Sequence, residues 1–107
     1  MGKMGKMKRK TELSLAFLLD LLGRDDHNYS SCMLVNEVGI ICLSGEDEDM
    51  AGRNKLISLL TDANPNHRAI AFSFLYLIDK EIPALAEFRV RPENQILLDM
   101  IDENLGN

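Results

Sequence analysis

Two histidines are the residues of this sequence whose type and surroundings best suit acid–base or metal chemistry. His27 directly follows Asp25 and Asp26. His67 lies five residues after Asp62. Each histidine falls in a segment that we predict to be a turn between helices, and imidazole and carboxylate groups together can transfer protons or bind a metal ion. If the two turns lie side by side, the sequence offers a His/Asp cluster.

No other signal for catalysis accompanies these histidines. The sequence contains no glycine-rich phosphate loop, no nucleophile elbow, no HExxH motif and no pair of CxxC motifs. No nucleophile and no cationic group able to stabilise an oxyanion joins the histidines in the pattern. We therefore expect them to cap helices and close turns, in a protein that is not an enzyme and that holds no cofactor and no metal.

The chain contains two cysteines, Cys32 and Cys42, and both lie in apolar surroundings. So low a count without regular spacing argues against a disulfide scaffold and against a zinc module. We expect both side chains to be buried as small hydrophobic groups. A reducing compartment fits best, so we expect the protein in the cytoplasm.

Charge is distributed unevenly along the chain, whose net charge is −5. Residues 1–10 contain five basic residues and no acid, so the remaining 97 residues carry 17 acids against 7 bases, a net charge of −10. We predict a flexible basic tail over 1–10 and a single helical-repeat domain over 11–107. An acidic domain repels phosphate backbones and attracts cationic surfaces. We therefore expect a basic protein partner and disfavour nucleic acid.

No segment of the sequence predicts a membrane span or a secretory signal. The apolar run over 13–19 ends at Asp20, whereas a spanning helix needs about 20 apolar residues. No small-residue cleavage site follows the run, so it does not fit a signal peptide.

Apolar residues recur mostly at helical spacing, which predicts an all-α protein of about six helices in antiparallel pairs. We predict Thr11 as the N-cap of the first helix and Gly23 as its C-terminal stop. Residues 38–43 are rich in β-branched side chains and also fit a strand, but a lone strand would leave its backbone groups unpaired, so a helix is favoured. The predicted helices cover 11–22, 29–43, 49–61, 65–80, 82–89 and 92–104. The fourth is apolar around most of its circumference and is predicted to be the central buried element.

A run of four acids, Glu46 to Asp49, precedes the third predicted helix. Carboxylates at a helix start complement the positive end of its dipole, which explains the run as capping. Calcium binding is the alternative, but the run lacks the alternating ligands and central glycine of an EF-hand loop. In the helix that follows, we expect Met50 and Leu56 to be buried together with Ile57, Leu59 and Leu60.

The chain also contains an internal repeat. A shift of 38 residues aligns 22–28 with 60–66, and an amphipathic helix precedes each segment while a strongly apolar helix follows it. Such a period is typical of helix-turn-helix repeats. Three stacked pairs would form a short α-solenoid with a shared core, and an irregular helical bundle is the alternative.

Residues 59–72 resemble a HEAT repeat. The resemblance lies in a turn rich in Asp, Asn and Pro followed by Arg and small residues, and Asp62 and Arg68 match the pattern. It implies that these two residues stabilise neighbouring repeats and have no catalytic role. Ser31 and Gln95 stand where the family's Arg would be in the first and third units, so the resemblance covers about 25 residues and is weak elsewhere.

These observations predict a non-enzymatic protein–protein interaction module with an acidic binding face. The face is expected to contain the acids of two inter-helix turns, namely Asp25, Asp26, Glu46, Asp47, Glu48 and Asp49. One alternative is a bacterial immunity or inhibitor protein that neutralises a basic toxin domain, which fits the size and charge. A less favoured alternative is a metal-binding protein that uses the turn histidines. The oligomeric state stays open.

Overall fold

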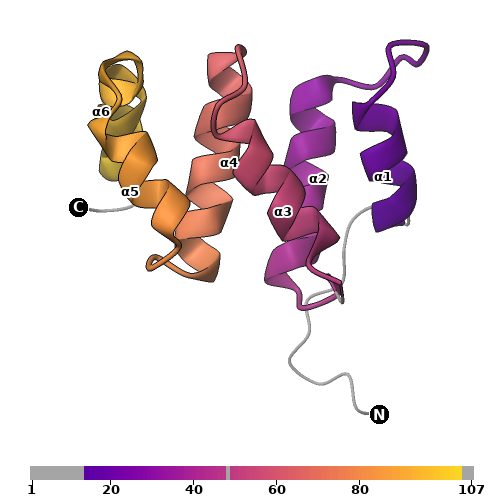
Figure 1. The fold of residues 1–107 in the computed structure, drawn as a ribbon. Coiled ribbons are helices and arrows are strands. Elements are labelled where there is room, and N and C mark those ends of the chain that lie inside the picture. The colour runs from indigo at the N-terminus through magenta and orange to yellow at the C-terminus, as the bar shows by residue number, and fades with distance from the viewer. Residues whose placement is uncertain (1–13, 48, 105–107) are drawn as a thin grey trace.

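The computed structural model describes residues 14–47 and 49–104, and this part of the chain forms six α-helices and one 3₁₀ turn without any strand (Figure 1). The elements are α1 (Leu15–Leu22), α2 (Ser31–Leu43), α3 (Ala51–Leu59), α4 (Pro65–Ile78), α5 (Pro83–Val90), η1 (Pro92–Asn94) and α6 (Gln95–Asn104). The predicted all-α fold is confirmed. Among the described helices, none has both the length and the hydrophobicity that crossing a membrane requires. The predicted basic tail, 1–10, lies outside the described residues.

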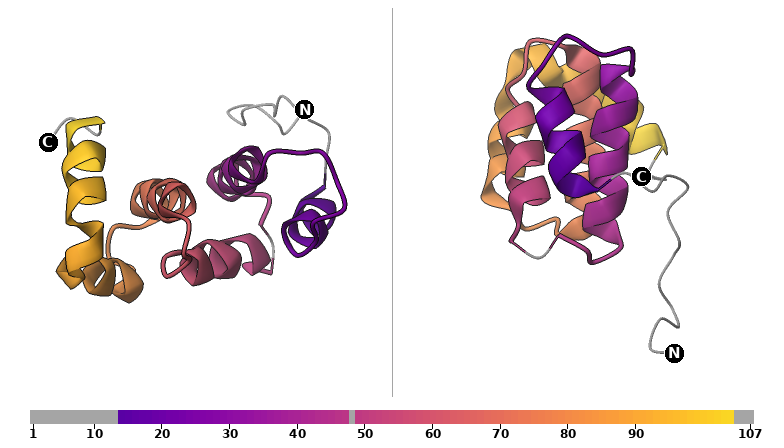
Figure 2. Two further views of the ribbon diagram at one scale, coloured as in Figure 1. Left: turned by 90° about the horizontal axis from the view of Figure 1, so that it is seen from above. Right: turned by 90° about the vertical axis from the view of Figure 1, so that its right-hand side faces the viewer.

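The helices alternate between two layers. Seen from above, α1, α3 and α5 lie on one side and α2 and α4 on the other, while α6 runs across the end of the array (Figure 2). Helix α4 packs against α2, α3, α5 and α6, and its contact with α2 is the most extensive between any two helices. The prediction that this helix is central is therefore confirmed, but its predicted burial is limited to Ala71, Phe72 and Leu75. The α1–α2 and α3–α4 turns lie at the same end of the molecule, and the α2–α3 turn lies at the opposite end (Figure 1).

Helix α1 begins later than predicted. Its N-cap is Ser14, whose hydroxyl accepts a hydrogen bond from the backbone N–H of Phe17 at 3.2 Å, so the prediction of Thr11 as the cap is wrong. Ser14 directly precedes the apolar run, and a start there brings Leu18 and Leu21 into the core. Gly23 ends the helix as predicted, with its N–H bonded to carbonyl groups of the last turn.

The segment that fitted either a strand or a helix is part of helix α2, which runs to Leu43. Its N-cap is Ser30, whose hydroxyl accepts from the N–H of Met33 at 3.3 Å. Gly39 allows the close approach of α2 to α4, because a Cβ at this position would overlap the ring of Phe74. A glycine in the middle of an isolated helix lowers the stability of that helix. Here the close packing of α2 against α4 offsets this loss.

The core of the described residues is formed by one cluster of aliphatic and aromatic side chains contributed by every helix. Its fully buried members with the largest side chains are Phe72, Phe88, Leu18, Leu21, Leu34, Ile41, Leu56 and Leu75. Several expectations of burial are wrong. Cys32, Cys42 and Ile57 are only half-buried, and two other apolar side chains are exposed. Met50, which is the N-cap residue of α3 and has a left-handed backbone conformation, is 46% exposed. Leu77 is 56% exposed, so one side of α4 presents an apolar side chain to solvent instead of to the core.

Candidate functional site

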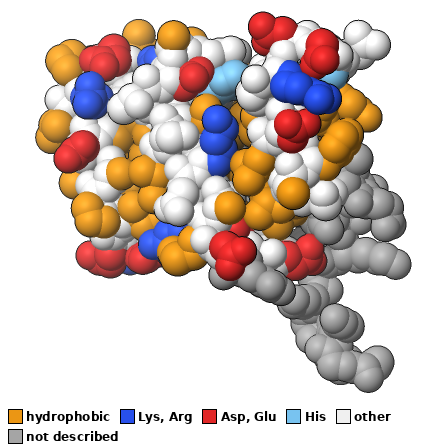
Figure 3. Space-filling model, turned by 45° about the vertical axis from the view of Figure 1, so that its right-hand side comes forward, with side chains coloured by type: hydrophobic (Ala, Val, Ile, Leu, Met, Phe, Trp, Pro, Cys, Tyr) orange, Lys and Arg blue, Asp and Glu red, His pale blue; other side chains and the backbone are white. Residues whose placement is uncertain are grey.

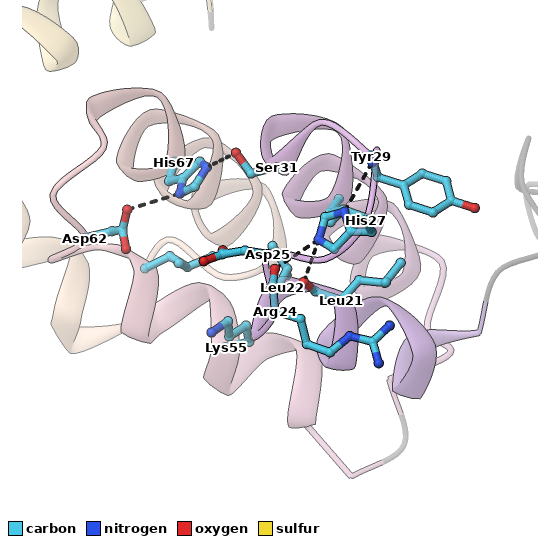
Figure 4. A pocket seen from close by; sticks show the side chains of 12 residues that line it. Leu21, Leu22, Arg24, Asp25, His27, Tyr29, Ser31, Lys55, Asp62 and His67 are labelled. Carbon is cyan, nitrogen blue, oxygen red and sulfur yellow. Dashed lines mark hydrogen bonds and ion pairs between the residues drawn. The ribbon is translucent and has the colours of Figure 1, made fainter.

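A cavity opens at the end of the molecule where the α1–α2 and α3–α4 turns lie side by side (Figure 4). Its volume is about 470 Å³. Residues of both turns and of the adjoining helix ends line it, namely Leu21, Leu22, Arg24, Asp25, His27, Tyr29, Ser31, Leu34, Lys55, Leu59, Asp62 and His67. The two predicted histidine turns therefore meet at one cavity, between the first pair of helices and the second.

His27 closes its own turn. Its Nε2 lies 2.9 Å from the carbonyl oxygen of Leu21 and 3.1 Å from that of Arg24, and carbonyl oxygens can only accept hydrogen bonds. Its Nδ1 lies 3.1 Å from the backbone nitrogen of Tyr29, which donates to it. The ring therefore carries its proton on Nε2, and the backbone occupies both ring nitrogens. This geometry corresponds to the turn-forming role that the sequence favours for His27.

His67 is the central member of a chain of three polar side chains. Its Nδ1 lies 3.1 Å from Oδ2 of Asp62, and its Nε2 lies 2.8 Å from the hydroxyl oxygen of Ser31 (Figure 4). A carboxylate can only accept, so Nδ1 donates to Asp62 and Nε2 accepts from the Ser31 hydroxyl in the neutral ring. The same Asp62 oxygen accepts the backbone N–H of Asn64 at 3.0 Å, which fixes the carboxylate within the turn.

Ser31 is the residue that sequence reasoning missed at this cavity. It is 36 positions away from His67, and the sequence pattern indicates it only as a departure from the HEAT repeat. Its hydroxyl is nevertheless the group that His67 contacts. The two histidines line the same cavity but do not bond to one another, and no group of three or more His, Cys, Asp or Glu in the described part of the chain is placed to hold a metal ion.

The acids of the first turn are exposed. Asp25 lines the cavity, whereas Asp26 lies 3.1 Å from Nε of Arg24. Nη1 of Arg24 also lies 3.3 Å from a carboxylate oxygen of Asp20. Surface ion pairs of this kind contribute little to stability.

Asp47 has a structural role in the second acidic turn. Its two carboxylate oxygens accept the backbone N–H groups of Gly52 and Arg53, each at 2.8 Å, so it caps the start of α3 from five residues away. The capping expected of this acidic run is therefore observed for Asp47. Asp49 is exposed, and Glu48 lies outside the described residues.

The Asp47 carboxylate also contacts the thiol of Cys42, which donates to Oδ2 across 3.5 Å. Burial, followed by the negative charge of Asp47, raises the pKa of the Cys42 thiol from 9.0 to about 12. The neutral thiol is thus strongly favoured. Cys42 is half-buried and acts as a packed, weakly reactive group.

The two acidic turns that were expected to form one binding face lie apart. They flank the 13 residues of α2, whose length corresponds to about 20 Å. Acidic side chains gather at the upper and lower edges of the face shown in Figure 3, with hydrophobic side chains exposed between them. Asp25 and Asp26 therefore belong to one end of the molecule, and Glu46, Asp47 and Asp49 to the other.

Arg68 and Asp62 are close together, but they interact through the backbone. Nη1 of Arg68 donates to the carbonyl oxygens of Asp62 and Ala63 at 2.9 and 3.3 Å. Its Nε donates to the side-chain oxygen of Asn94 at 2.9 Å, and the Asn94 amide donates in turn to the carbonyl oxygen of Phe88 at 3.1 Å. Arg68 thereby connects the α3–α4 turn to the segment before α6.

A second concave feature lies between α2, α4 and α6. This groove, with a volume of about 230 Å³, is lined by Asn36, Ala69, Ile70, Ser73, Phe74, Leu97, Met100 and Ile101. On α6, Met100 is 55% exposed and Ile96 is 74% exposed. Met100 also lines a separate, shallow depression together with Asp99, Asp102 and Glu103.

No family model, no curated protein and no solved structure matches the chain.

Proposed function

We propose that the chain is a short helical-repeat module that binds a basic, amphipathic helix of a protein partner in the groove between α2, α4 and α6. The observation that carries this proposal is an open apolar groove whose exposed member, Met100, also lines a neighbouring depression that contains carboxylates. A helix in a groove is a common mode of recognition, in which apolar anchors enter the groove and polar residues stay at its rim.

The apolar part of the proposed site lies on one side of α6. Leu97, Met100 and Ile101 recur at helical spacing and face the groove, opposite Ile70 and Phe74 of α4. Met100 is more than half exposed in the free protein, and burying it against a partner would remove apolar surface from water. Methionine side chains adapt their shape readily, which suits them to a binding surface.

The charged part of the proposed site determines the class of partner. Asp99 and Glu103 lie beside Met100 and are exposed. A partner with lysine or arginine residues flanking its apolar anchors would pair with them, and complementary charges accelerate encounter and suppress wrong partners. The net charge of −10 on residues 11–107 extends this attraction beyond the groove.

The same proposal includes the repeat architecture and the cytoplasmic location that the sequence predicts. The bond between Arg68 and Asn94, which links the second helix pair to the third, supports a repeat-stabilising role for the Arg68 position. The two cysteines are unpaired, in line with a reducing compartment.

Binding to a defined probe tests the proposal. The probe is a fluorescein-labelled synthetic peptide about 18 residues long, or five helical turns, with leucine on one face and lysine on the other. We expect saturable binding to the full chain by fluorescence anisotropy. The variant Met100→Gln should weaken binding by about tenfold, which corresponds to about 1.4 kcal/mol. Leu77→Gln is the matched control, since Leu77 is equally exposed but does not line the groove.

The charges are tested separately. The double variant Asp99→Asn and Glu103→Gln should slow association and reduce its salt dependence, because exposed charges act mainly on the encounter rate. A peptide of the same composition with leucine and lysine shuffled should bind far more weakly. Equal affinity of the shuffled peptide, or of the Met100→Gln variant and the original protein, would overturn the groove as the binding site.

A further inference from the structure

Ser31, His67 and Asp62 form a linear hydrogen-bonded array at the turn-side cavity. The distances are 2.8 Å from Ser31 Oγ to His67 Nε2 and 3.1 Å from His67 Nδ1 to Asp62 Oδ2. Three separate elements supply the three side chains, namely the first turn of α2, the first turn of α4 and the turn before it. In this order a carboxylate orients an imidazole, and the imidazole can remove a proton from a hydroxyl group.

All three groups line the cavity, and they differ in exposure. Ser31 is exposed and lines the cavity, so a substrate can reach its hydroxyl. The His67 side chain is only 13% exposed, and its two bonds fix the ring. Asp62 also lines the cavity, and its side chain is 36% exposed, but its Oδ2 is bonded to His67 and to the N–H of Asn64. Asp62 is therefore a positioning residue.

The start of α2 supplies donors next to the hydroxyl. Ser30 accepts the N–H of Met33, whereas the backbone N–H groups of Ser31 and Cys32 donate to no acceptor in the described part of the chain. The N-terminus of this 13-residue helix also carries the positive end of its dipole. Backbone N–H groups beside a nucleophile are the donors that stabilise the oxyanion in acyl transfer.

We propose that Ser31 is the nucleophile of an acyl-transfer site that accepts small carboxylic esters with an apolar acyl group. The wall of the cavity suits such a group, since Leu22, Leu34 and Leu59 line it. This site lies apart from the α2/α4/α6 groove, so the proposal is independent of partner binding.

The reaction balances with water as the only co-reactant. Ser31 Oγ attacks the ester carbonyl carbon while its proton passes to His67 Nε2. The bond from that carbon to the alcohol oxygen then breaks, and the alcohol leaves with the proton from His67. Water, deprotonated by His67, attacks the acyl-serine, and the carboxylic acid departs as Ser31 recovers its proton.

Active-site labelling tests the proposal. The full chain is incubated with a fluorophosphonate probe, and the modified residue is identified by peptide mass spectrometry. We expect one label per chain at Ser31 and no label in Ser31→Ala. His67→Gln should slow labelling by about 10³-fold or more, and Asp62→Asn by a similar factor because the ring would lose its orienting acceptor. Ser58→Ala, an exposed serine on α3 outside the cavity, is the control and should react like the original protein.

Two readouts separate catalysis from a purely structural link between helices. Circular dichroism melting shows whether each variant is folded, and only folded variants are compared. Asp62→Asn should also change the dependence of the labelling rate on pH, which a purely structural role would not do. Absence of label at Ser31, or a label that persists in folded His67→Gln, would overturn the proposal. p-Nitrophenyl acetate then tests the substrate class, with a burst of one p-nitrophenolate per chain expected.

Discussion

The side-chain oxygen of Asn94 accepts a hydrogen bond from Nε of Arg68 at 2.9 Å, although the two residues are 26 positions apart. Asn94 is fully buried, and its amide nitrogen donates to the carbonyl oxygen of Phe88. One side chain therefore satisfies a cation from the second helix pair and a backbone group of the third. Buried polar groups that are completely satisfied specify a unique packing, whereas partly satisfied ones are costly.

Replacing Asn94 should destabilise the protein. Asn94→Ala would leave both the Arg68 Nε–H and the Phe88 carbonyl oxygen without this partner in a buried region, at a cost of about 2–3 kcal/mol. Chemical denaturation measures the loss. Asn54→Ala, on the exposed side of α3, is the control and should change stability by less than about 0.5 kcal/mol. Equal stability of the two variants would show that the Arg68–Asn94 bond does not hold the helix pairs together.

Adding even a single methyl group at Gly39 should lower the free energy of unfolding. A methyl group at this position would overlap the Phe74 ring, so Gly39→Ala should cost about 1–3 kcal/mol despite the better helix propensity of alanine. Gly23→Ala is the control, because a Cβ there meets only carbonyl oxygens at 3.6 Å or more. The double variant Gly39→Ala with Phe74→Leu should recover part of the loss. A stabilised Gly39→Ala would mean that α2 and α4 are not in close contact at this position.

The Asp47 cap at the start of α3 should contribute to the stability of the protein. Asp47→Ala removes the acceptor of the Gly52 and Arg53 N–H groups, and the loss of such a cap costs about 1–2 kcal/mol. The neighbouring change Asp49→Ala affects an exposed side chain and serves as the control. Thermal melting of both variants checks this. If both changes lowered the melting temperature equally, acidity of the turn in general, and not the Asp47 cap, would be responsible.

Because of Cys42, the free energy of unfolding should depend on pH in the alkaline range. The folded protein raises the pKa of this thiol from 9.0 to about 12, so between these values the folded state holds a proton that the unfolded state has lost. The contribution to stability is therefore complete below pH 9.0 and declines as the pH rises toward about 12. Denaturation of the original protein and of Cys42→Ala across this range measures it. The difference in unfolding free energy between the two proteins should shrink with rising pH, and parallel curves would contradict the account.

Local patterns in the sequence predict much of this fold. Apolar residues at helical spacing identify all six helices, and Gly23 and Pro65 mark a helix end and a helix start as predicted. The strand alternative for 38–43 fails because the described chain offers no strand to pair with, and the helix buries Val38 and Ile41 instead. These features depend on neighbours within one or two helical turns, which the sequence displays directly.

Long-range neighbours were not predictable in this way. Nothing near Ser31 indicates that His67 lies 2.8 Å from it, and nothing near Asn94 indicates Arg68. The prediction of a single acidic face fails for the same reason. A count of charges along the sequence does not show that the length of α2 separates the two acidic turns in space. Asp47 was predicted to belong to this face, but its carboxylate accepts the backbone N–H groups of Gly52 and Arg53 at the start of α3. A polar side chain beside a helix start is a signal for capping, but its partner across the fold depends on how the helices pack.

The most direct test of the central claim is a titration of the isotope-labelled chain with the basic amphipathic peptide, followed by backbone amide NMR shifts. We expect the largest shifts at the groove, at Ser73 of α4 and at Leu97, Met100 and Ile101 of α6. The amides of Asp25, Asp26 and Asp49 should change little. Shifts concentrated in the two acidic turns, with the groove unaffected, would contradict the claim and would identify those turns as the binding surface.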